Sequence, residues 1–436
     1  MKNLYQDLQQ KTAVIGVIGL GYVGLPIAIS LAKSGYSVIG IDINTSHIQQ
    51  LNEGQSYILD VSDQEVKRYV PSKLTVTSNY DAVEQMNAIL ICVPTPLTIA
   101  KEPDTSFIES VVDGLENYIQ QDTLIVLEST TYPGSTQELI VDPIEHRKKW
   151  TVGKEFYVCF SPERVDPGNV TYHVDNTPKV IGGMTSECLK VGLELYSKFI
   201  QKVVPVSSVK VAELSKLVEN TFRCVNIAFV NELLLLGERL GIDIWETIDA
   251  AATKPFGFMK FTPGPGVGGH CIPLDPMYLS WAAKRDNFFS RFIELAMDVN
   301  SNMPYMVVRQ VIALLAKQGK SIENSNILLV GMTYKDDIDD LREAPALVIY
   351  DLLKEKQANV DFYDHYVPSF LYQGNQVQSV NLAEETIQNY DVVVITAKHK
   401  EVDYQAIMNQ ASVVLDTKNV FGEKVKQGVY RLGDPI

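Results

Sequence analysis

The chain has 436 residues, of which 46% are hydrophobic and 21% are charged, and its formal net charge at pH 7 is −15. This composition is typical of a folded globular protein, and the length predicts two or three domains. An acidic chain repels nucleic-acid backbones, so we expect no nucleic acid as a partner. A local cationic pocket can still hold a small phosphorylated ligand.

Membrane and disulfide-rich classes are also disfavoured. No apolar run approaches the roughly 18 residues that span a bilayer, and the polar residues 1–11 lack the apolar stretch of a signal peptide. We therefore expect a cytoplasmic protein without a membrane partner. The cysteines are single and odd in number, which argues against a disulfide framework or a metal site. The five cysteines are Cys92, Cys159, Cys188, Cys224 and Cys271. All except Cys271 are expected to be buried small hydrophobes.

Short apolar strands alternate with helices in the first part of the chain. We predict strands at 12–19, 37–42, 87–93 and 123–128, and a helix at 25–34 after the first strand. This alternation is typical of a parallel α/β sheet.

The middle of the chain has a helical pattern instead. Apolar residues recur at helical spacing from 207 to 240, which predicts a long amphipathic helix. Further helices are expected at 244–252 and 288–318, with a loop at 254–276.

After residue 325 the α/β alternation returns. A helix is predicted at 344–356 among strands at 326–331, 359–364, 391–396 and 412–416. The expected fold is therefore α/β, with two doubly wound Rossmann-like domains joined by a helical central domain that contains a long helix. The expected domains are residues 1–206, 207–319 and 320–436.

A glycine-rich turn connects the first strand to the first helix. Gly19, Gly21 and Gly24 form a GxGxxG pattern, which permits a tight turn, close approach of a pyrophosphate and close helix–strand packing. Asp42 ends the second strand, where a carboxylate binds ribose hydroxyls and repels a 2′-phosphate. We therefore predict NAD rather than NADP, with Tyr22 and Val23 also in the site. The alternative is a glycine-rich turn in another α/β protein.

Residues 262–278 form a loop rich in glycine and proline that contains one cysteine. Such a loop offers backbone N–H groups to a phosphate or an oxyanion, and thiolates are favoured near these groups. Cys271 is therefore a candidate nucleophile, although a single cysteine is usually an inert core residue. Asp275 follows one helical turn later, so that both side chains can share a helical face.

Several motifs occur in the order found in the UDP-glucose/GDP-mannose dehydrogenase family, and the chain resembles that family over nearly its whole length. They are the GxGxxG turn, Val93–Pro96, Glu128–Thr130, Ser161–Glu163, Lys216–Asn220, the Cys271 loop, Tyr334–Lys335 and Arg342–Glu343. The resemblance implies an NAD-dependent enzyme that oxidises the C6 alcohol of a nucleotide sugar to a carboxylate in two steps.

The resemblance also implies catalytic roles. Cys271 attacks the C6 aldehyde, and the resulting thiohemiacetal loses a second hydride to leave a thioester. Lys216 stabilises the oxyanion, and Asn220, one helical turn away, holds the oxygen or a water. Asp275 assists proton transfer, and Glu163 helps to activate the hydrolytic water. For Lys216 taken alone, a solvated charge on the helix surface is the favoured alternative.

Further residues are implied to contact the ligands. Thr130 orients water or substrate, and Thr95 and Thr130 join the cofactor contacts. The second α/β domain is expected to bind UDP through Lys335 and Arg342, which follow its first strand, where open sheets bind ligands. An ordinary surface charge is a strong alternative for Lys335. The remaining expected substrate contacts are Arg164, Lys216, Asn220, Gly268 and Gly269.

Two further positions are left open. Lys418 stands where the family has an arginine, and a lysine loses bidentate geometry, so its substrate role is in doubt. Phe258 or Phe261 is expected against the uracil, and the sequence does not choose between them.

Two departures from the family pattern narrow the substrate. Pro167 stands where UDP-glucose enzymes have a second glutamate, and His270 precedes the cysteine in place of a small residue. Both features resemble the UDP-N-acetylhexosamine branch, and the Cys271 loop is most similar to UDP-N-acetylglucosamine 6-dehydrogenases. The N-acetylmannosamine and N-acetylgalactosamine epimers stay open, and UDP-glucose is the alternative.

Two other classes of protein remain as competitors. A one-step β-hydroxyacid dehydrogenase shares the GxGxxG domain but needs neither the thiol nor a third domain. A non-catalytic UDP-sugar binder has no use for a thiol. The family pairs through its middle helices, so we also expect a homodimer through the central helices.

Overall fold

The computed structural model describes residues 4–58, 60–98, 100–164, 171–382, 387–422 and 426–435. They form two compact units, one built from residues 1–219 and 277–288 and the other from 220–276 and 289–436. Helices α8 (Val209–Leu240) and α10 (Asp275–Arg285) contribute residues to both units. The three domain boundaries expected from the sequence divide the chain differently and stay a prediction.

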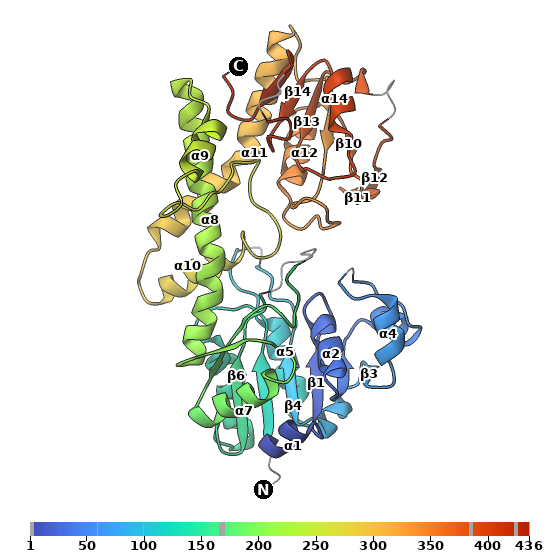
Figure 1. The fold of residues 1–436 in the computed structure, drawn as a ribbon, viewed down its shortest axis with the longest axis vertical. Helices are drawn as coiled ribbons and strands as arrows, with labels where there is room; N and C mark the ends of the chain where they lie inside the picture. Colours follow the sequence, from blue (N-terminus) through green and yellow to red (C-terminus); the bar gives the residue numbers. More distant parts are fainter. Residues whose placement is uncertain are drawn as a thin grey trace. The chain divides into compact units, whose positions relative to one another are not determined.

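The first unit is built on a sheet whose described strands follow the order β3-β2-β1-β4-β5-β6-β7-β8 (Figure 1). The first six strands are parallel, β7 is antiparallel to β6, and β8 is parallel to β7. The strands are β1 (Val14–Ile18), β2 (Ser37–Ile41), β3 (Leu74–Thr77), β4 (Ala88–Ile91), β5 (Thr123–Leu127), β6 (Phe156–Phe160), β7 (Lys179–Gly183) and β8 (Val203–Val206).

Helices cover both faces of this sheet. One core packs the sheet against α1 (Leu4–Gln10), α2 (Gly24–Lys33), α4 (Asp63–Tyr69) and α7 (Ser186–Tyr196). The other packs it against η1 (Tyr80–Gln85), α5 (Ser106–Leu115), η2 (Gln137–Val141), α6 (Asp142–Lys148) and the start of α8. Helix α3 (Thr45–Asn52) follows β2.

The apolar strands follow from this burial. In β1, Ile15 and Val17 enter one core, and Ile18 enters the other. A strand with both faces covered is apolar at every position instead of alternating, as the sequence shows.

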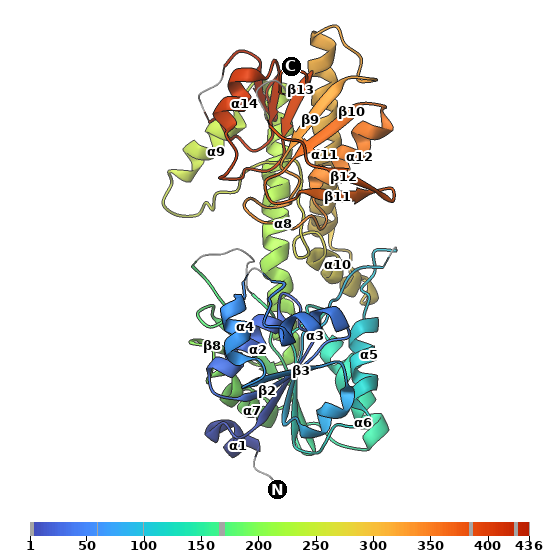
Figure 2. The ribbon, with the colours of Figure 1, turned by 90° about the vertical axis from the view of Figure 1, so that its right-hand side faces the viewer.

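The second unit contains a parallel sheet in the order β10-β9-β13-β14-β15 (Figure 2). Its strands are β9 (Asn326–Val330), β10 (Asn359–Tyr363), β13 (Val392–Ile395), β14 (Val414–Asp416) and β15 (Val429–Arg431). Helices α9 (Ile244–Ala252), α11 (Arg291–Lys317) and α12 (Pro345–Glu355) share a core with one face, and α14 (Tyr404–Gln410) packs on the other.

The predicted fold class is confirmed, with two Rossmann-like sheets and a helical middle. Several strands were not predicted, namely β3, β6, β7, β8, β15 and the hairpin strands β11 (Ser369–Tyr372) and β12 (Asn375–Gln378), and two cases show why. Strand β8 contains Pro205, which a strand tolerates at the edge of a sheet but which breaks the apolar pattern. The hairpin of β11 and β12 is short, its second strand is mostly polar, and it is closed by Gly374 at a φ of 79°. In the described part of the chain, no helix is long and apolar enough to cross a bilayer.

Candidate functional site

The three glycines of the turn after β1 have different steric surroundings. Gly19 has a φ of 87°, and a Cβ there would lie 2.7 Å from the Cys92 carbonyl oxygen. A Cβ on Gly24 would lie 1.8 Å from the Gly19 carbonyl oxygen, so α2 can begin only with glycine. A Cβ on Gly21 would meet nothing within 4 Å. The open position is therefore the middle one, where a dinucleotide pyrophosphate is expected.

Asp42 lies beside this turn at the end of β2. Its carboxylate accepts hydrogen bonds from the Leu20 N–H and the Asn44 N–H, both at 2.8 Å. Asp42 is half-buried. Tyr22 is exposed and Val23 precedes the first helical residue. These residues fit the predicted ribose and pyrophosphate contacts, whose roles stay predictions.

The turns after β4 and β5 are joined by buried hydrogen bonds. The Thr95 hydroxyl donates to the Thr130 carbonyl oxygen at 2.7 Å, and the Tyr278 hydroxyl of α10 donates to the carbonyl oxygens of Thr95 and Pro96. Thr95 and Thr130, which the sequence predicts in one site, therefore lie together at the carboxyl ends of neighbouring strands. This is the edge of an open sheet at which ligands bind.

Glu163 is the outermost member of a buried ionic group. Lys179, the first residue of β7, places Nζ 2.8 Å from Glu163 and 2.6 Å from Glu128. Tyr196 of α7 donates a further hydrogen bond to Glu128. Burial raises the pKa of Glu128 to about 7, with Glu163 acting in the same direction and Lys179 and Tyr196 opposing. Sequence reasoning missed Lys179, because nothing local marks a lysine that starts a strand.

Two other predicted residues of the first unit have strong contacts. Arg164 forms an ion pair with Glu219 of α8 at 2.6 Å and donates to the Pro178 carbonyl oxygen at 2.7 Å. Lys216 has only 8% of its surface exposed. It is therefore not the solvated helix charge that the sequence alone favoured. Pro167 lies outside the described residues.

In the second unit, the predicted nucleophile differs from the other cysteines. Cys271 is exposed, whereas the remaining four are buried. The Asp275 N–H donates to the Cys271 carbonyl oxygen at 3.0 Å, so the nucleophile lies one turn before α10. Asn220 and Asp275 are buried, and the Asn220 amide donates to the Asp275 carboxylate. Cys271, Asn220 and Asp275 are thus brought close together.

The Cys271 loop is anchored on two sides within the second unit. The Gly269 N–H donates to the Arg342 carbonyl oxygen at 2.8 Å, and a Cβ on Gly268 would lie 2.6 Å from the Glu343 carbonyl oxygen. On the other side, the Gly264 N–H donates to the amide of Asn231 in α8 at 3.0 Å.

A second asparagine completes that anchor. Asn231 donates to Asn300 of α11 at 3.0 Å, and Asn300 donates to the Cys224 carbonyl oxygen at 3.0 Å. Both asparagines are buried. Sequence reasoning missed them because buried amides at helix crossings have no local signature.

His270 precedes the nucleophile and is affected by its charged neighbours. Burial lowers the pKa of His270, and the Arg342 cation lowers it further, against a smaller opposing effect of Asp340. Arg342 itself forms hydrogen bonds with both carboxylate oxygens of Asp340, with the closest pair of atoms at 2.6 Å. His270 is therefore neutral at pH 7.

The remaining predicted substrate contacts are spread over the second unit. Lys335 and Arg342 follow β9, and Lys418 follows β14 and lies 3.6 Å from Asp336. Phe258 is exposed, whereas Phe261 is partly buried and contacts Phe222 with ring centroids 5.8 Å apart. Among the described residues, no three His, Cys, Asp or Glu side chains are grouped to hold a metal ion.

The predicted site residues thus form two groups, each described within its own unit. The first contains the glycine turn, Asp42, Thr95, Thr130, Glu163, Arg164 and Lys216. The second contains Asn220, Gly268, Gly269, Cys271, Asp275, Lys335 and Arg342.

Comparison with known proteins finds relatives that match nearly the whole chain. The chain is 34% identical over 440 residues to the UDP-N-acetyl-D-mannosamine dehydrogenase of Methanocaldococcus jannaschii, covering 96% of each chain. It is 33% identical to the UDP-N-acetyl-D-glucosamine 6-dehydrogenase of Salmonella typhi, covering 89% of this chain and 90% of that one. The solved structure of a UDP-D-ManNAc dehydrogenase from Pyrococcus horikoshii matches with a TM-score of 0.88 and 31% identity, covering 97% of this chain and 99% of that one.

Three parts of the chain match the domains of one family. Residues 13–200 match the NAD binding domain, 210–302 the central domain and 328–423 the UDP binding domain of the UDP-glucose/GDP-mannose dehydrogenase family. The chain belongs to this family and is one of its NAD-dependent UDP-sugar dehydrogenases.

Proposed function

We propose that the chain oxidises the C6 alcohol of a UDP-N-acetylhexosamine to a carboxylate, with two NAD reduced per sugar. One observation carries the proposal: Cys271 is an exposed thiol one helical turn before Asp275, whose buried carboxylate is held by Asn220. A UDP-sugar binder or a one-step dehydrogenase has no use for this arrangement. The relatives named above support the same class of reaction.

The first oxidation removes a hydride from C6 and a proton from its hydroxyl group, which leaves an aldehyde. When bound, NAD would supply the hydride acceptor for both oxidations, with one NAD used in each. Lys216 stabilises the negative charge that develops on the oxygen as the proton leaves. Thr130 orients the substrate, and Asp275 takes part in the proton transfer.

The second oxidation needs a tetrahedral carbon, which Cys271 supplies. Its thiolate adds to C6, so that a C–S bond forms and the carbonyl electron pair moves to the oxygen. Asn220 and Lys216 hold that oxygen. Loss of a second hydride from C6 then gives a thioester, which water hydrolyses with the help of Glu163.

The ligand contacts are proposed from the two sheet edges. The turn of Gly19 to Gly24 would hold NAD, with Asp42 accepting hydrogen bonds from the ribose hydroxyls and Thr95 and Thr130 adding further contacts. Lys335, Arg342, Arg164, Gly268 and Gly269 contact the UDP-sugar. We propose three domains on this basis: residues 1–206 bind NAD, residues 207–319 carry the catalytic loop, and residues 320–436 bind UDP.

The sugar is the finer part of the proposal. His270 and the loop around it resemble the N-acetylhexosamine branch, with N-acetylglucosamine as the first expectation from the sequence. Relatives of similar identity are named for the mannosamine and the glucosamine substrates. We therefore propose UDP-N-acetylmannosamine and UDP-N-acetylglucosamine as the two substrates to compare first.

A panel assay tests this proposal. Each UDP-sugar is incubated with NAD, and both NADH and uronate are measured. Two NADH per uronate with a UDP-N-acetylhexosamine is the expected result, and Cys271→Ala should lose uronate formation while still binding NAD and UDP-sugar. Better turnover of UDP-glucose would overturn the branch assignment. One NADH per sugar with a stable carbonyl product would overturn the thioester route.

We also propose a homodimer through the central helices, in the cytoplasm where NAD and UDP-sugars are available together. Exposed apolar side chains at helical spacing support the dimer, because monomers rarely expose large apolar patches. On α8 they are Val211, Leu214, Val218, Phe222, Phe229, Leu236 and Leu240, and on α11 they are Phe292, Leu295 and Tyr305. Light scattering on the purified protein and on Phe229→Glu tests the assembly, and cell fractionation tests the location.

A further inference from the structure

We propose that Lys179 is a positioning residue for the hydrolytic step, because it fixes the Glu163 carboxylate and stabilises its ionised form. The inference rests on the proposed function, in which Glu163 activates the water that releases the product. It concerns a contact within the first unit and adds a role for a residue that lies behind the predicted site.

The geometry places Lys179 between two carboxylates. The lysine side chain is 3% exposed, Glu128 is fully buried, and Glu163 at the outer end is 14% exposed. Tyr196 of α7 closes the inner end by its hydrogen bond to Glu128, and Cys92 after β4 is the other titratable group close to Glu128. The order from core to surface is therefore Tyr196, Glu128, Lys179, Glu163.

The second oxygen of Glu163 is also occupied. It accepts the N–H of Arg164 at 2.7 Å, while the first accepts Nζ of Lys179. Two donors on two different oxygens define the plane of a carboxylate, so Glu163 has one orientation. A general base must lie within hydrogen-bond reach of the proton it removes, and this requires a fixed orientation.

The charges favour the same role. Burial alone would lower the pKa of Lys179, but Glu128 and Glu163 together raise it above its ordinary value, so the lysine stays charged. Burial raises the pKa of Glu128, and Lys179 opposes this effect. At the outer end of the group, the Lys179 cation 2.8 Å from Glu163 stabilises the ionised form of that carboxylate.

A purely structural purpose does not explain the group well. Replacing a buried ion pair by uncharged residues of similar size is often neutral or stabilising for the fold. Hydrolysis of the thioester, in contrast, requires an ionised base. A water oxygen adds to the acyl carbon, its proton passes to Glu163, the C–S bond breaks, and the Cys271 sulfur leaves with the bonding electrons and regains a proton.

The test uses the full-length enzyme with NAD and the UDP-sugar that it turns over best. Lys179→Met should slow hydrolysis about 100-fold, which is within the range of a general base. NADH should still appear in a burst of two per active site, and a uronyl adduct on Cys271 should accumulate and be visible by intact-mass spectrometry. KM should fall together with kcat, because the thioester accumulates, so that kcat/KM for the UDP-sugar is unchanged. The acid limb of the hydrolysis rate should move to higher pH, because Glu163 without the cation takes up a proton more readily.

A double variant separates positioning from structural neutralisation. Lys179→Met alone leaves the buried Glu128 without its cation, which can impair folding. Glu128→Gln with Lys179→Met removes both charges and keeps a hydrogen-bond partner for Tyr196. If Lys179 only neutralises Glu128, this double variant should regain native hydrolysis. If Lys179 positions Glu163, the adduct should still accumulate.

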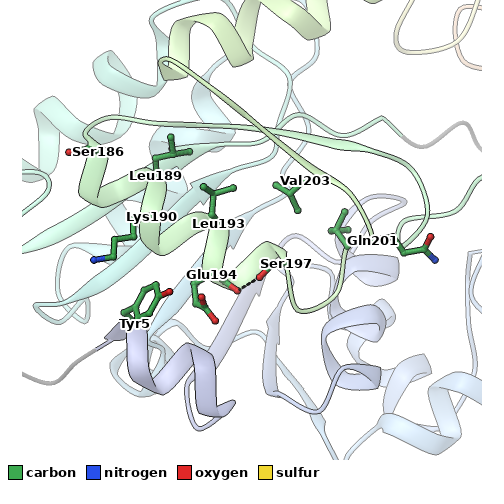
Figure 3. Close-up of a pocket in the computed structure, with 10 residues that line it drawn as sticks. Tyr5, Ser186, Leu189, Lys190, Leu193, Glu194, Ser197, Gln201 and Val203 are labelled. Atoms are coloured by element: carbon green, nitrogen blue, oxygen red, sulfur yellow. Dashed lines mark hydrogen bonds between the residues drawn. The ribbon is translucent and has the colours of Figure 1, made fainter.

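A matched control lies on the same unit. Lys198 forms an ion pair at 2.6 Å with Glu194 of α7, and Glu194 is one of the residues that line a surface hollow of about 600 Å³ (Figure 3). That hollow is lined by Tyr5, Ser186, Leu189, Lys190, Leu193, Glu194, Ser197, Ile200, Gln201 and Val203, none of which is a predicted site residue. Lys198→Met removes a lysine–glutamate ion pair that is more exposed than the Lys179 group and contains no predicted site residue, and it should leave hydrolysis unchanged.

The outcomes distinguish a failure of the proposed function from a failure of the role of Lys179. If the unaltered enzyme forms no uronate and no adduct on Cys271, the proposed function fails. If it forms both, and the double variant hydrolyses the thioester at the native rate, the role of Lys179 alone is wrong.

Discussion

Two glycine turns in this molecule have the same backbone geometry, but the carboxylate beside each turn has a different set of partners. Gly19 after β1 has a φ of 87° and donates to the Ile41 carbonyl oxygen at 2.8 Å. Gly331 after β9 has a φ of 90° and donates to the Tyr363 carbonyl oxygen at 2.8 Å. In both turns, this hydrogen bond joins the glycine after the first strand of the sheet to the last residue of the neighbouring parallel strand.

The carboxylate beside each turn accepts equivalent backbone groups. Asp42 accepts the N–H groups of Leu20 and Asn44. Asp364, which follows β10, accepts those of Met332 and Tyr366. The first carboxylate is half-buried, whereas the second is buried.

A histidine accounts for the difference. His399, which is buried after β13, lies 3.1 Å from Asp364 through Nε2 and accepts the Asp337 N–H on Nδ1 at 3.0 Å. Because Nδ1 is an acceptor, Nε2 carries the proton and donates it to Asp364. The second carboxylate therefore has an internal partner in the place where Asp42 can receive a ribose.

The comparison shows that this backbone geometry alone does not determine whether a sheet edge binds a dinucleotide. The first turn continues at once into α2, with an open position at Gly21. The second turn is followed by an excursion from Thr333 to Ala344 before α12 begins, and the Asp364–His399 pair holds its start. The carboxylate beside the second turn is thus closed off by a histidine, in the part of the chain that matches the UDP binding domain of the family.

The largest effect on NAD affinity is expected from a substitution that disrupts the first turn. Gly24→Ala places a Cβ 1.8 Å from the Gly19 carbonyl oxygen, so α2 must move away from β1. We expect a loss of NAD affinity of more than about 100-fold, because the phosphate contact and the helix packing fail together. Titration calorimetry with NAD and with UDP measures this, and UDP binding should persist because its residues belong to the second unit.

Gly21→Ala is the matched control for that experiment. Its added Cβ meets no protein atom within 4 Å, so circular dichroism and Tm should stay native. NAD affinity should still fall, because the methyl group occupies the space of the pyrophosphate. Equal loss of structure in both variants would contradict the separate roles of the two glycines.

A smaller effect is expected at the first carboxylate. Asp42→Ala removes the ribose acceptor and two acceptors of backbone N–H groups, and should weaken NAD binding about 10-fold to 100-fold. The preference for NAD over NADP should narrow, because the charge that repels a 2′-phosphate is gone. Asp42→Asn keeps one acceptor oxygen and should lose less. Equal use of NAD and NADP by the unaltered enzyme would refute this account.

Local pattern explains which of these features the sequence could predict. The first glycine turn and the strand before it follow from an apolar run, glycine spacing and an acid at the next strand end. At the second turn, only the strands at 326–331 and 359–364 were predicted. The partner of Asp364 does not follow from local pattern, since His399 lies far along the chain and only the strand order β10-β9-β13 brings the two together. Lys179 and Asn231 were missed for the same reason.

The second carboxylate should affect stability more than cofactor binding. Burial alone would raise the pKa of Asp364, but hydrogen bonds from His399 and from the Met332 and Tyr366 amides hold it below its ordinary value. A lowered pKa contributes stability above the unfolded value near 4, and this contribution is lost as pH falls through the folded value. Asp364→Asn should therefore cost about 2 kcal/mol at pH 7 and progressively less at acid pH.

Thermal unfolding at several pH values tests this prediction. A loss of about 2 kcal/mol should lower the Tm of the second unit by about 6 °C at pH 7. NAD affinity should be unchanged, because Asp42 and its turn belong to the other unit. A constant Tm difference down to pH 3 would show that the Asp364 charge is not the source of the effect.

The smallest expected effect concerns Lys418, which follows β14 at the UDP-binding edge. Its Nζ lies 3.6 Å from Asp336, and the side chain is 28% exposed, so the pair is a partly exposed one that contributes less than about 1 kcal/mol. A lysine also lacks the planar fork that grips a phosphate with two hydrogen bonds. We expect Lys418→Ala to leave NAD affinity and Tm unchanged and to raise the KM for the UDP-sugar less than about 5-fold, which corresponds to under 1 kcal/mol. Lys335→Ala, measured beside it, should raise that KM more, because Lys335 lies in the excursion that the Asp364–His399 pair holds in place. If Lys418→Ala raises KM more than Lys335→Ala, then Lys418 performs the phosphate contact of the family arginine, and the second edge binds its nucleotide through β14 rather than through the turn after β9.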